Sequence, residues 1–307
     1  MFCGIALGWG MPVLRAEQAA QPQSQPNQGQ LLLRRARAAL AGHRTISAKI
    51  HQRIRLYDQE LVGSGTFVQG PPEQNLLYLD LTVKVDGQDC YVQQRCDGKY
   101  FWDQRLIDGV PRLTRIDVER VAAARRASAS RATRPDLAGG TPARRAVTPT
   151  PQLPVLGLGG VAQILDQFEA WCVFQRVREA KLTGPEELPV YLLEATWRPE
   201  RLVQWLPDQR GAVEKGLPID LDKLPAVLPD RMIVSLGRDD LFPRRIDYGV
   251  SPSRRIDSQQ LPLVQIYFED VQFDEAVAPQ QFTFEGGVAA PVDGTDAYLL
   301  REGLLGR

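Results

Sequence analysis

The chain of 307 residues is long enough for one large domain or two ordinary ones, and 43% hydrophobic residues allow a sizeable core. Its 37 basic residues balance its 37 acidic residues, so no whole-chain field favours nucleic acid or an anionic membrane surface. Only two histidines are present, His43 and His51, which disfavours mechanisms with a histidine base and most zinc sites.

The first residues are similar to an export signal. A hydrophobic run from Phe2 to Leu14 precedes Ala16 and the polar stretch EQAAQPQSQPNQGQ, as in the core and cleavage site of a secretory signal peptide. The run is too short to span a membrane. We therefore predict a signal peptide over residues 1–16, a disordered linker over 17–28, and a soluble protein exported to the periplasm. An uncleaved, disordered start is the alternative.

Residues 30–115 predict one helix followed by an antiparallel meander. In QLLLRRARAALAG the hydrophobic residues recur at helical spacing, and Gly42 marks the helix end. From Thr45 onward hydrophobic and polar residues alternate, which is typical of strands. The pairs Asp86-Gly87 and Asp97-Gly98 stand between such runs and predict tight hairpin turns.

The middle of the chain interrupts this pattern. Residues 128–154 are rich in Ala, Arg, Thr, Pro and Gly and predict a disordered, basic insertion, read as a solvated loop or, less favoured, a tether to lipid or a partner. Next, LGLGGVAQILDQFEAW predicts a helix entered through glycines, and strands resume from CVFQRVREAKL to LPLVQIYFEDVQF. We predict a single domain over residues 29–292 and a C-terminal tail over 293–307.

No catalytic motif is present in the sequence. It contains no G-x-S-x-G elbow, phosphate-binding loop, dinucleotide fingerprint or H-E-x-x-H motif, and Asp239-Asp240 is read as a hairpin turn. We predict a protein that is not an enzyme and has no cofactor or metal site. Cys90 and Cys96 fall in one predicted strand, where their Cα atoms would be roughly 20 Å apart, too far for a disulfide. We therefore predict at least one free, buried thiol.

Several predicted strands are hydrophobic on both faces. The runs KYFW, NLLYLDL and LPLVQIYFEDVQF place large apolar side chains on each side of a sheet, although a sheet with one wet face should alternate cleanly. Helices could cover one face while the other lines a cavity in a curled sheet. A β-sandwich with a dense core explains the pattern equally well.

The order of these motifs resembles the LolA family of periplasmic lipoprotein carriers. The matching parts are a helix, TISAKIHQRIRLYDQELVGSGTFVQGPPEQNLLYLDL, DGKYFW, and the ending LVQIYFEDVQFDEAVAPQQFTFEGGVAAPVD, over about residues 30–102 and 161–292. The resemblance implies a mainly β fold with helices (α+β), an incomplete antiparallel β-barrel whose apolar concave face is covered by helices. It departs in the turn QGPPEQN, which lacks the arginine that can latch the family's lid.

The two-sided strands and this resemblance together predict an apolar ligand site. The cavity would be lined by Leu79, Leu81, Phe101, Trp102, Leu193, Ile266 and Phe268, and the lid would carry Leu33, Ile164 and Phe168. The implied function is the transport of lipoprotein acyl chains, or other lipids, by a monomer between an inner-membrane donor and an outer-membrane acceptor, with no nucleic acid involved. A sensor or interaction module with the same fold is the alternative, and an envelope hydrolase is less favoured.

Overall fold

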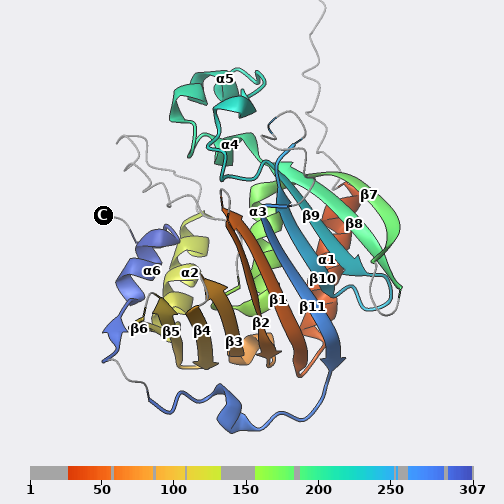
Figure 1. Ribbon diagram of the computed structural model, residues 1–307. Helices are drawn as coiled ribbons and strands as arrows, with labels where there is room; N and C mark the ends of the chain where they lie inside the picture. Colours follow the sequence, from red (N-terminus) through yellow and green to blue (C-terminus); the bar gives the residue numbers. More distant parts are fainter. Residues whose placement is uncertain are drawn as a thin grey trace, which may run out of the picture.

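Twelve strands form one sheet in the computed structural model, which describes residues 27–56, 59–85, 88–107, 109–132, 156–182, 187–251, 254, 262–286 and 290–305. Two antiparallel meanders, β1 to β6 and β7 to β11, are joined by the pairing of β1 with β11 (Figure 1). The strands are β1 (Ile46–Leu56), β2 (Gln59–Gln69), β3 (Leu76–Val85), β4 (Gln88–Asp97), β5 (Tyr100–Ile107), β6 (Val110–Asp117), β7 (Cys172–Leu182), β8 (Leu188–Trp197), β9 (Arg231–Gly237), β10 (Pro243–Gly249), β11 (Val264–Phe273) and β12 (Val292–Asp293).

The sheet stays open, because its two ends, β12 and β7, do not pair with each other. The short strand β12 runs parallel to β6 and closes off the first meander. Gly65 on β2 packs so tightly against β3 that a Cβ atom there would lie 1.7 Å from the carbonyl oxygen of Asp80. A glycine is therefore required at this position of β2. The mainly β, open half-barrel predicted from the sequence is confirmed.

Two helices, α1 (Gln28–Ala41) and α3 (Gly160–Trp171), pack on one face of the sheet, called the inner face below (Figure 1). The side chain of Asn27 caps α1 by accepting a hydrogen bond of 3.0 Å from the amide of Gln30, and Gly42 ends the helix as predicted. The hydrophobic stripe of α1 is buried, with Leu33 and Ala36 fully inaccessible. Amphipathicity thus decides which side of the helix meets the sheet.

The remaining helices lie at the edges of this core. The helices α2 (Val118–Ala132) and α6 (Thr295–Arg301) lie side by side next to β6, whereas α4 (Pro199–Leu202) and α5 (Arg210–Glu214) belong to the connection between β8 and β9 (Figure 1). None of the helices in the described part of the chain has both the length and the hydrophobicity of a membrane-spanning segment.

A buried ion pair fixes the end of the β8–β9 connection. Asp230 and Arg254 are 3.2 Å apart, and their side chains are only 2% and 4% exposed. Asp230 also accepts hydrogen bonds from the amide and hydroxyl of Ser251, at 2.6 and 2.8 Å. Arg254 donates to the carbonyl oxygens of Leu224 and Leu228. Burial of both charges is tolerated because further hydrogen bonds satisfy each of them.

Three predicted boundaries differ from the structure. The helix α1 begins at Gln28, the last residue of the predicted linker, and α2 continues through Ala132 into the predicted insertion. The predicted tail contains α6, whose Tyr298 and Leu299 are buried against the core. A helix this short carries too few hydrophobic residues to show a period in the sequence. The predicted signal peptide, residues 17–26 of the predicted linker and residues 133–154 of the predicted insertion lie outside the described residues.

Candidate functional site

The inner face of the sheet carries one continuous apolar cluster beneath α1 and α3. Nearly all predicted site residues belong to it, and none of these is more than 5% exposed. They are Leu79, Leu81, Phe101, Leu193, Ile266 and Phe268 on the strands and Leu33, Ile164 and Phe168 on the helices. The structure therefore brings the predicted cavity and lid residues together, although in this state their side chains pack against one another.

Trp102 is the exception, because it lies on the outer face. Neighbouring residues of a strand point to opposite faces, so Phe101 enters the core and Trp102 does not. The Trp102 ring stacks on Phe284 with 4.7 Å between ring centroids, and the guanidinium of Arg115 lies 5.9 Å from the same ring. The structure thus places Trp102 outside the predicted cavity, where the segment before β12 covers it.

Helix α3 is tied to the sheet at its first turn. The Gln69 side-chain oxygen, on β2, accepts a hydrogen bond of 3.0 Å from the backbone amide of Val161. Gly159 and Gly160 precede it with φ angles of +97° and +59°, which confirms the predicted glycine start of the helix. A Cβ atom on Gly160 would lie 2.2 Å from the Gln69 oxygen. The glycine pair therefore permits both the left-handed backbone and this contact.

Ion pairs join α3 to α1. Arg34 and Arg37 lie 2.5 and 2.9 Å from the carboxylate of Glu169, and Arg37 also pairs with Asp166. Partial burial acts to raise the pKa of Glu169, but the two arginines outweigh it and hold this pKa below its ordinary value. Burial raises the pKa of Asp166, with Arg37 opposing. The two helices therefore form a cover held together by charge as well as by apolar contact.

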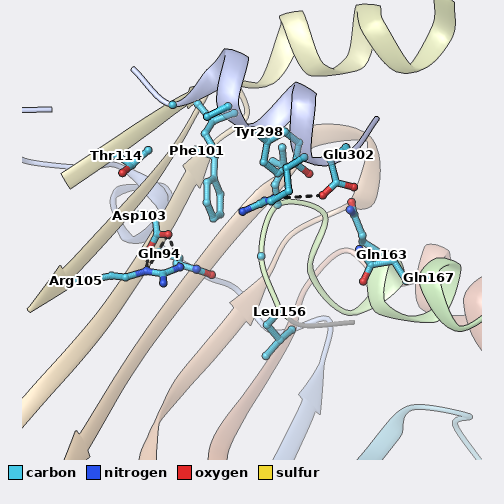
Figure 2. A pocket seen from close by; sticks show the side chains of 16 residues that line it. Gln94, Phe101, Asp103, Arg105, Thr114, Leu156, Gln163, Gln167, Tyr298 and Glu302 are labelled. Atoms are coloured by element: carbon cyan, nitrogen blue, oxygen red, sulfur yellow. Dashed lines mark hydrogen bonds and ion pairs between the residues drawn. The ribbon is translucent and has the colours of Figure 1, made fainter. Parts of the chain in front are cut away.

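A cavity of about 300 Å³ lies beside this cover, between β4–β6, the segment leading into α3, and α6 (Figure 2). Part of its lining is apolar and is shared with the core cluster, as for Phe101 and Ile116. The rest is polar: Gln94, Asp103, Arg105, Thr114, Gln163, Gln167, Tyr298, Arg301 and Glu302. The volume is at the lower end of the range of ligand pockets, about 300–1,000 Å³.

The charged groups of this cavity are already paired. Arg105 donates to both carboxylate oxygens of Asp103, with its Nη2 atom 2.7 Å from Oδ2, and this hydrogen bonding raises the pKa of Arg105. Arg301 lies 3.7 Å from Glu302. Burial raises the pKa of Tyr298, so its hydroxyl stays protonated at neutral pH. The lining thus offers neutral hydrogen-bonding groups and two internally balanced ion pairs.

Two amide oxygens of the cavity lining have no hydrogen-bond partner among the residues that the structure describes. They belong to Gln94, which is 5% exposed, and to Gln167 on α3. Neither residue belongs to the site predicted from the sequence. The signal was present for Gln94, since Val92, Gln94 and Cys96 alternate on β4 and place a glutamine on the inner face.

The thiols agree with the sequence-based prediction. Cys90 and Cys96 lie on the single strand β4, and Cys90, Cys96 and Cys172 are all free. Burial raises the pKa of Cys96 to about 12 and that of Cys172 further still. These two buried thiols therefore act as small apolar side chains. Within the described ranges, no three His, Cys, Asp or Glu side chains are grouped closely enough to hold a metal ion.

Comparisons with known proteins find no match by sequence, and the solved structures that are similar to this chain have low identities and low TM-scores. No protein-family model and no curated protein sequence matches the chain. Similar solved structures include the MucA/MucB complex of Pseudomonas aeruginosa (12% identity, TM-score 0.36), lipoprotein LppX of Mycobacterium tuberculosis (8%, 0.37) and a LolA superfamily protein from Nitrosomonas europaea (10%, 0.29). The matches cover 84%, 81% and 84% of this chain and 61%, 97% and 98% of the respective matched chains. This chain therefore spans about 61% of the matched chain from the MucA/MucB complex, and almost all of the other two.

Proposed function

We propose that this chain is a non-enzymatic binding protein for the acyl chains of lipids or lipoproteins, and that it carries them between membranes of the cell envelope. The observation that supports this most is the apolar inner face under two helices, next to a cavity that shares Phe101 and Ile116 with it. An acyl chain gains about 0.8 kcal/mol for each methylene group removed from water. A long chain lying on this face could therefore replace the side chains that α3 now supplies.

In this proposal α3 is the lid. It contributes Ile164, Leu165 and Phe168 to the cluster, and all three are inaccessible to solvent. Its polar ties are the Gln69–Val161 hydrogen bond and the ion pairs from α1 to Asp166 and Glu169. Gln69 comes from the QGPPEQN turn, where the family resemblance would place an arginine latch. We assign the latch function to Gln69 in this chain.

The proposed setting is the periplasm, with a donor at the inner membrane and an acceptor at the outer membrane. This part rests on the sequence resemblance to LolA-like carriers and on the signal-like first residues. The proposed ligand cargo is an acyl chain of a lipoprotein or another lipid, bound by one copy of the chain without a cofactor.

The test is ligand identification followed by a matched pair of variants. Native mass spectrometry of protein purified without detergent should show a co-purifying lipid, and delipidated protein should take up a fluorescent fatty acid. Leu81→Arg places a charge on the inner face, whereas Thr82→Arg places the same charge on the exposed outer face of the same strand. We expect uptake to be lost in the first and retained in the second, with circular dichroism confirming that both fold. Unchanged uptake by folded Leu81→Arg protein would exclude the proposal.

A further inference from the structure

The walls of the cavity beside α6 contain two buried hydrogen-bond acceptors that have no partner among the described residues. Gln94 and Gln167 each place a buried side-chain oxygen at the cavity without a partner, from β4 and α3 respectively. A buried acceptor without a partner is costly, so native proteins keep few of them. Figure 2 shows Gln94 beside Asp103 and Arg105 at one end of the cavity and Gln167 on α3 at another. Both oxygens have almost no accessible surface as they stand, so a ligand group would bond them once the two amides turn toward the cavity.

Both arginines among the described lining residues of this cavity are already paired, and Arg125 beside it donates to Gln163 and Tyr298. Arg105 is engaged by both oxygens of Asp103, and Arg301 lies beside Glu302 and over the ring of Tyr298 at 4.8 Å. A carboxylate or phosphate head group accepts hydrogen bonds but cannot donate them, and it needs a positive partner when it leaves water.

A hydroxyl group suits this lining in either orientation of the glutamine amides. If the side-chain oxygens face the cavity, a hydroxyl donates to them, and if the amides are turned the hydroxyl accepts from the nitrogens. Next to these polar groups, Phe101 and Ile116 connect the cavity to the apolar inner face. The lining therefore combines a neutral polar end with an apolar continuation.

We infer that this cavity binds the neutral glyceryl head group of an acylated glycerol, with the acyl chain continuing from Phe101 along the inner face. The inference rests on the proposed acyl-chain function and names the head-group class for it. Gln94 and Gln167 hydrogen-bond the glyceryl hydroxyl or ester groups. Because Arg105 is paired with Asp103, its positive charge is not free to bind an anionic lipid.

The experiment compares two amphiphiles with the same chain, 1-monolauroylglycerol and laurate, by titration calorimetry of the delipidated protein below their aggregation concentrations. We expect the glyceride to bind about tenfold more tightly, the value of one or two net hydrogen bonds. Gln94→Leu should weaken glyceride binding about tenfold and leave laurate unchanged. Gln93→Leu is the matched control, because Gln93 is the preceding residue and bonds Asp80 on the outer face.

The outcomes separate the inference from the function on which it rests. If laurate binds as tightly as the glyceride, or if Gln94→Leu and Gln167→Leu both bind the glyceride like the unmodified protein, the head-group inference is wrong and the carrier proposal stands. If neither amphiphile binds the unmodified protein, both fall. Gln167→Leu on α3 provides a second variant should Gln94→Leu fail to fold, and the ranking of the two amphiphiles needs no variant.

Discussion

The side-chain oxygen of Gln69 accepts a hydrogen bond of 3.0 Å from the backbone amide of Val161, and this bond links the end of β2 to the first turn of α3. Gln69 is 4% exposed. The first amides of a helix have no partner within the helix, so a side chain that reaches one of them caps the helix from outside. In this protein the cap comes from the sheet, and it therefore also fixes where the proposed lid begins.

Replacing Gln69 by Leu should lower the free energy of unfolding by about 1–3 kcal/mol, because the Val161 amide is left buried without its partner. Urea unfolding followed by circular dichroism would measure this. The exposed Gln88, replaced by Leu, is the control, and we expect it to change stability by less than about 0.5 kcal/mol. If Gln69 is the latch of the lid, the same variant should release a bound fluorescent fatty acid faster. An unchanged release rate in a destabilised variant would limit Gln69 to a structural role.

The Glu169 ion pairs predict a pH-dependent contribution to stability. Partial burial opposes ionisation of Glu169, but Arg34 and Arg37 prevail and lower its pKa. A carboxyl whose pKa is lower in the folded state stabilises the fold at pH values above its unfolded pKa of about 4.3. That contribution is lost as the pH falls through the lower, folded-state pKa.

We therefore expect Glu169→Gln to be less stable than the unmodified protein by about 0.5–1 kcal/mol at neutral pH, as for other exposed ion pairs. The difference should shrink as the pH falls below about 4. Removing Glu169 also relieves its repulsion of Asp166, which keeps the effect at the smaller end. Urea midpoints measured across the acid range would show this, with exposed Glu179→Gln as the control. A difference between Glu169→Gln and the unmodified protein that stays constant with pH would contradict the pKa assignment.

Much of the fold could be predicted from the sequence, because the helix and turn signals agreed with the alternation of hydrophobic and polar residues along the strands. The α1 stripe, the glycines before α3, the Asp97-Gly98 turn and the alternation of Leu77, Leu79 and Leu81 each indicate the observed element. The predicted cavity included both Phe101 and Trp102, although neighbouring strand residues point to opposite faces and only one of them can enter it. The sequence does not say which of the two faces is inner. That depends on the Phe284 contact, whose partners lie far apart in sequence.

The cavity is harder to predict from the sequence than the fold. Its lining comes from β4–β6, α3 and α6, and no short-range pattern reports that these segments meet. The sequence predicts an apolar ligand site. The charged pair of Asp103 and Arg105 gave no signal, because two opposite charges at positions i and i+2 of a strand most often form an ordinary surface ion pair. Gln94 could have been noticed as a polar residue at an inner-face position, but its unpartnered oxygen required the structure.

The thiols should differ in reactivity according to burial. Cys90 is partly exposed, whereas burial raises the pKa of Cys96 to about 12 and protects Cys172. Brief treatment of the folded protein with iodoacetamide at pH 8 should modify Cys90 and leave the other two unmodified, since the thiolate is the reactive form. Peptide mapping would identify the sites, and denatured protein, in which Cys90, Cys96 and Cys172 should all react, is the control. Modification of Cys96 at the rate of Cys90 would show that β4 opens readily.

Breaking the Asp103–Arg105 pair should shift the proposed head-group preference toward anionic head groups. In the unmodified protein Arg105 donates to Asp103 from Nε to Oδ1 at 3.0 Å and from Nη2 to Oδ2 at 2.7 Å. In Asp103→Asn the neutral amide can no longer neutralise the guanidinium. The guanidinium then becomes available to an anionic head group in the cavity. Laurate binding should tighten about three- to tenfold, corresponding to roughly 0.7–1.4 kcal/mol for a charge-assisted contact at a partly exposed arginine.

Three measurements by titration calorimetry decide whether the gain comes from Arg105. The tighter laurate binding of Asp103→Asn should weaken between low and high salt, because the new contact is an exposed charge interaction. It should disappear in the double variant Asp103→Asn/Arg105→Gln, which removes the released cation. Binding of 1-monolauroylglycerol should change little in either variant, since its head group carries no charge. If Asp103→Asn binds laurate no better than the unmodified protein, the pairing of Arg105 does not set the specificity of this cavity, and another feature must exclude the anion.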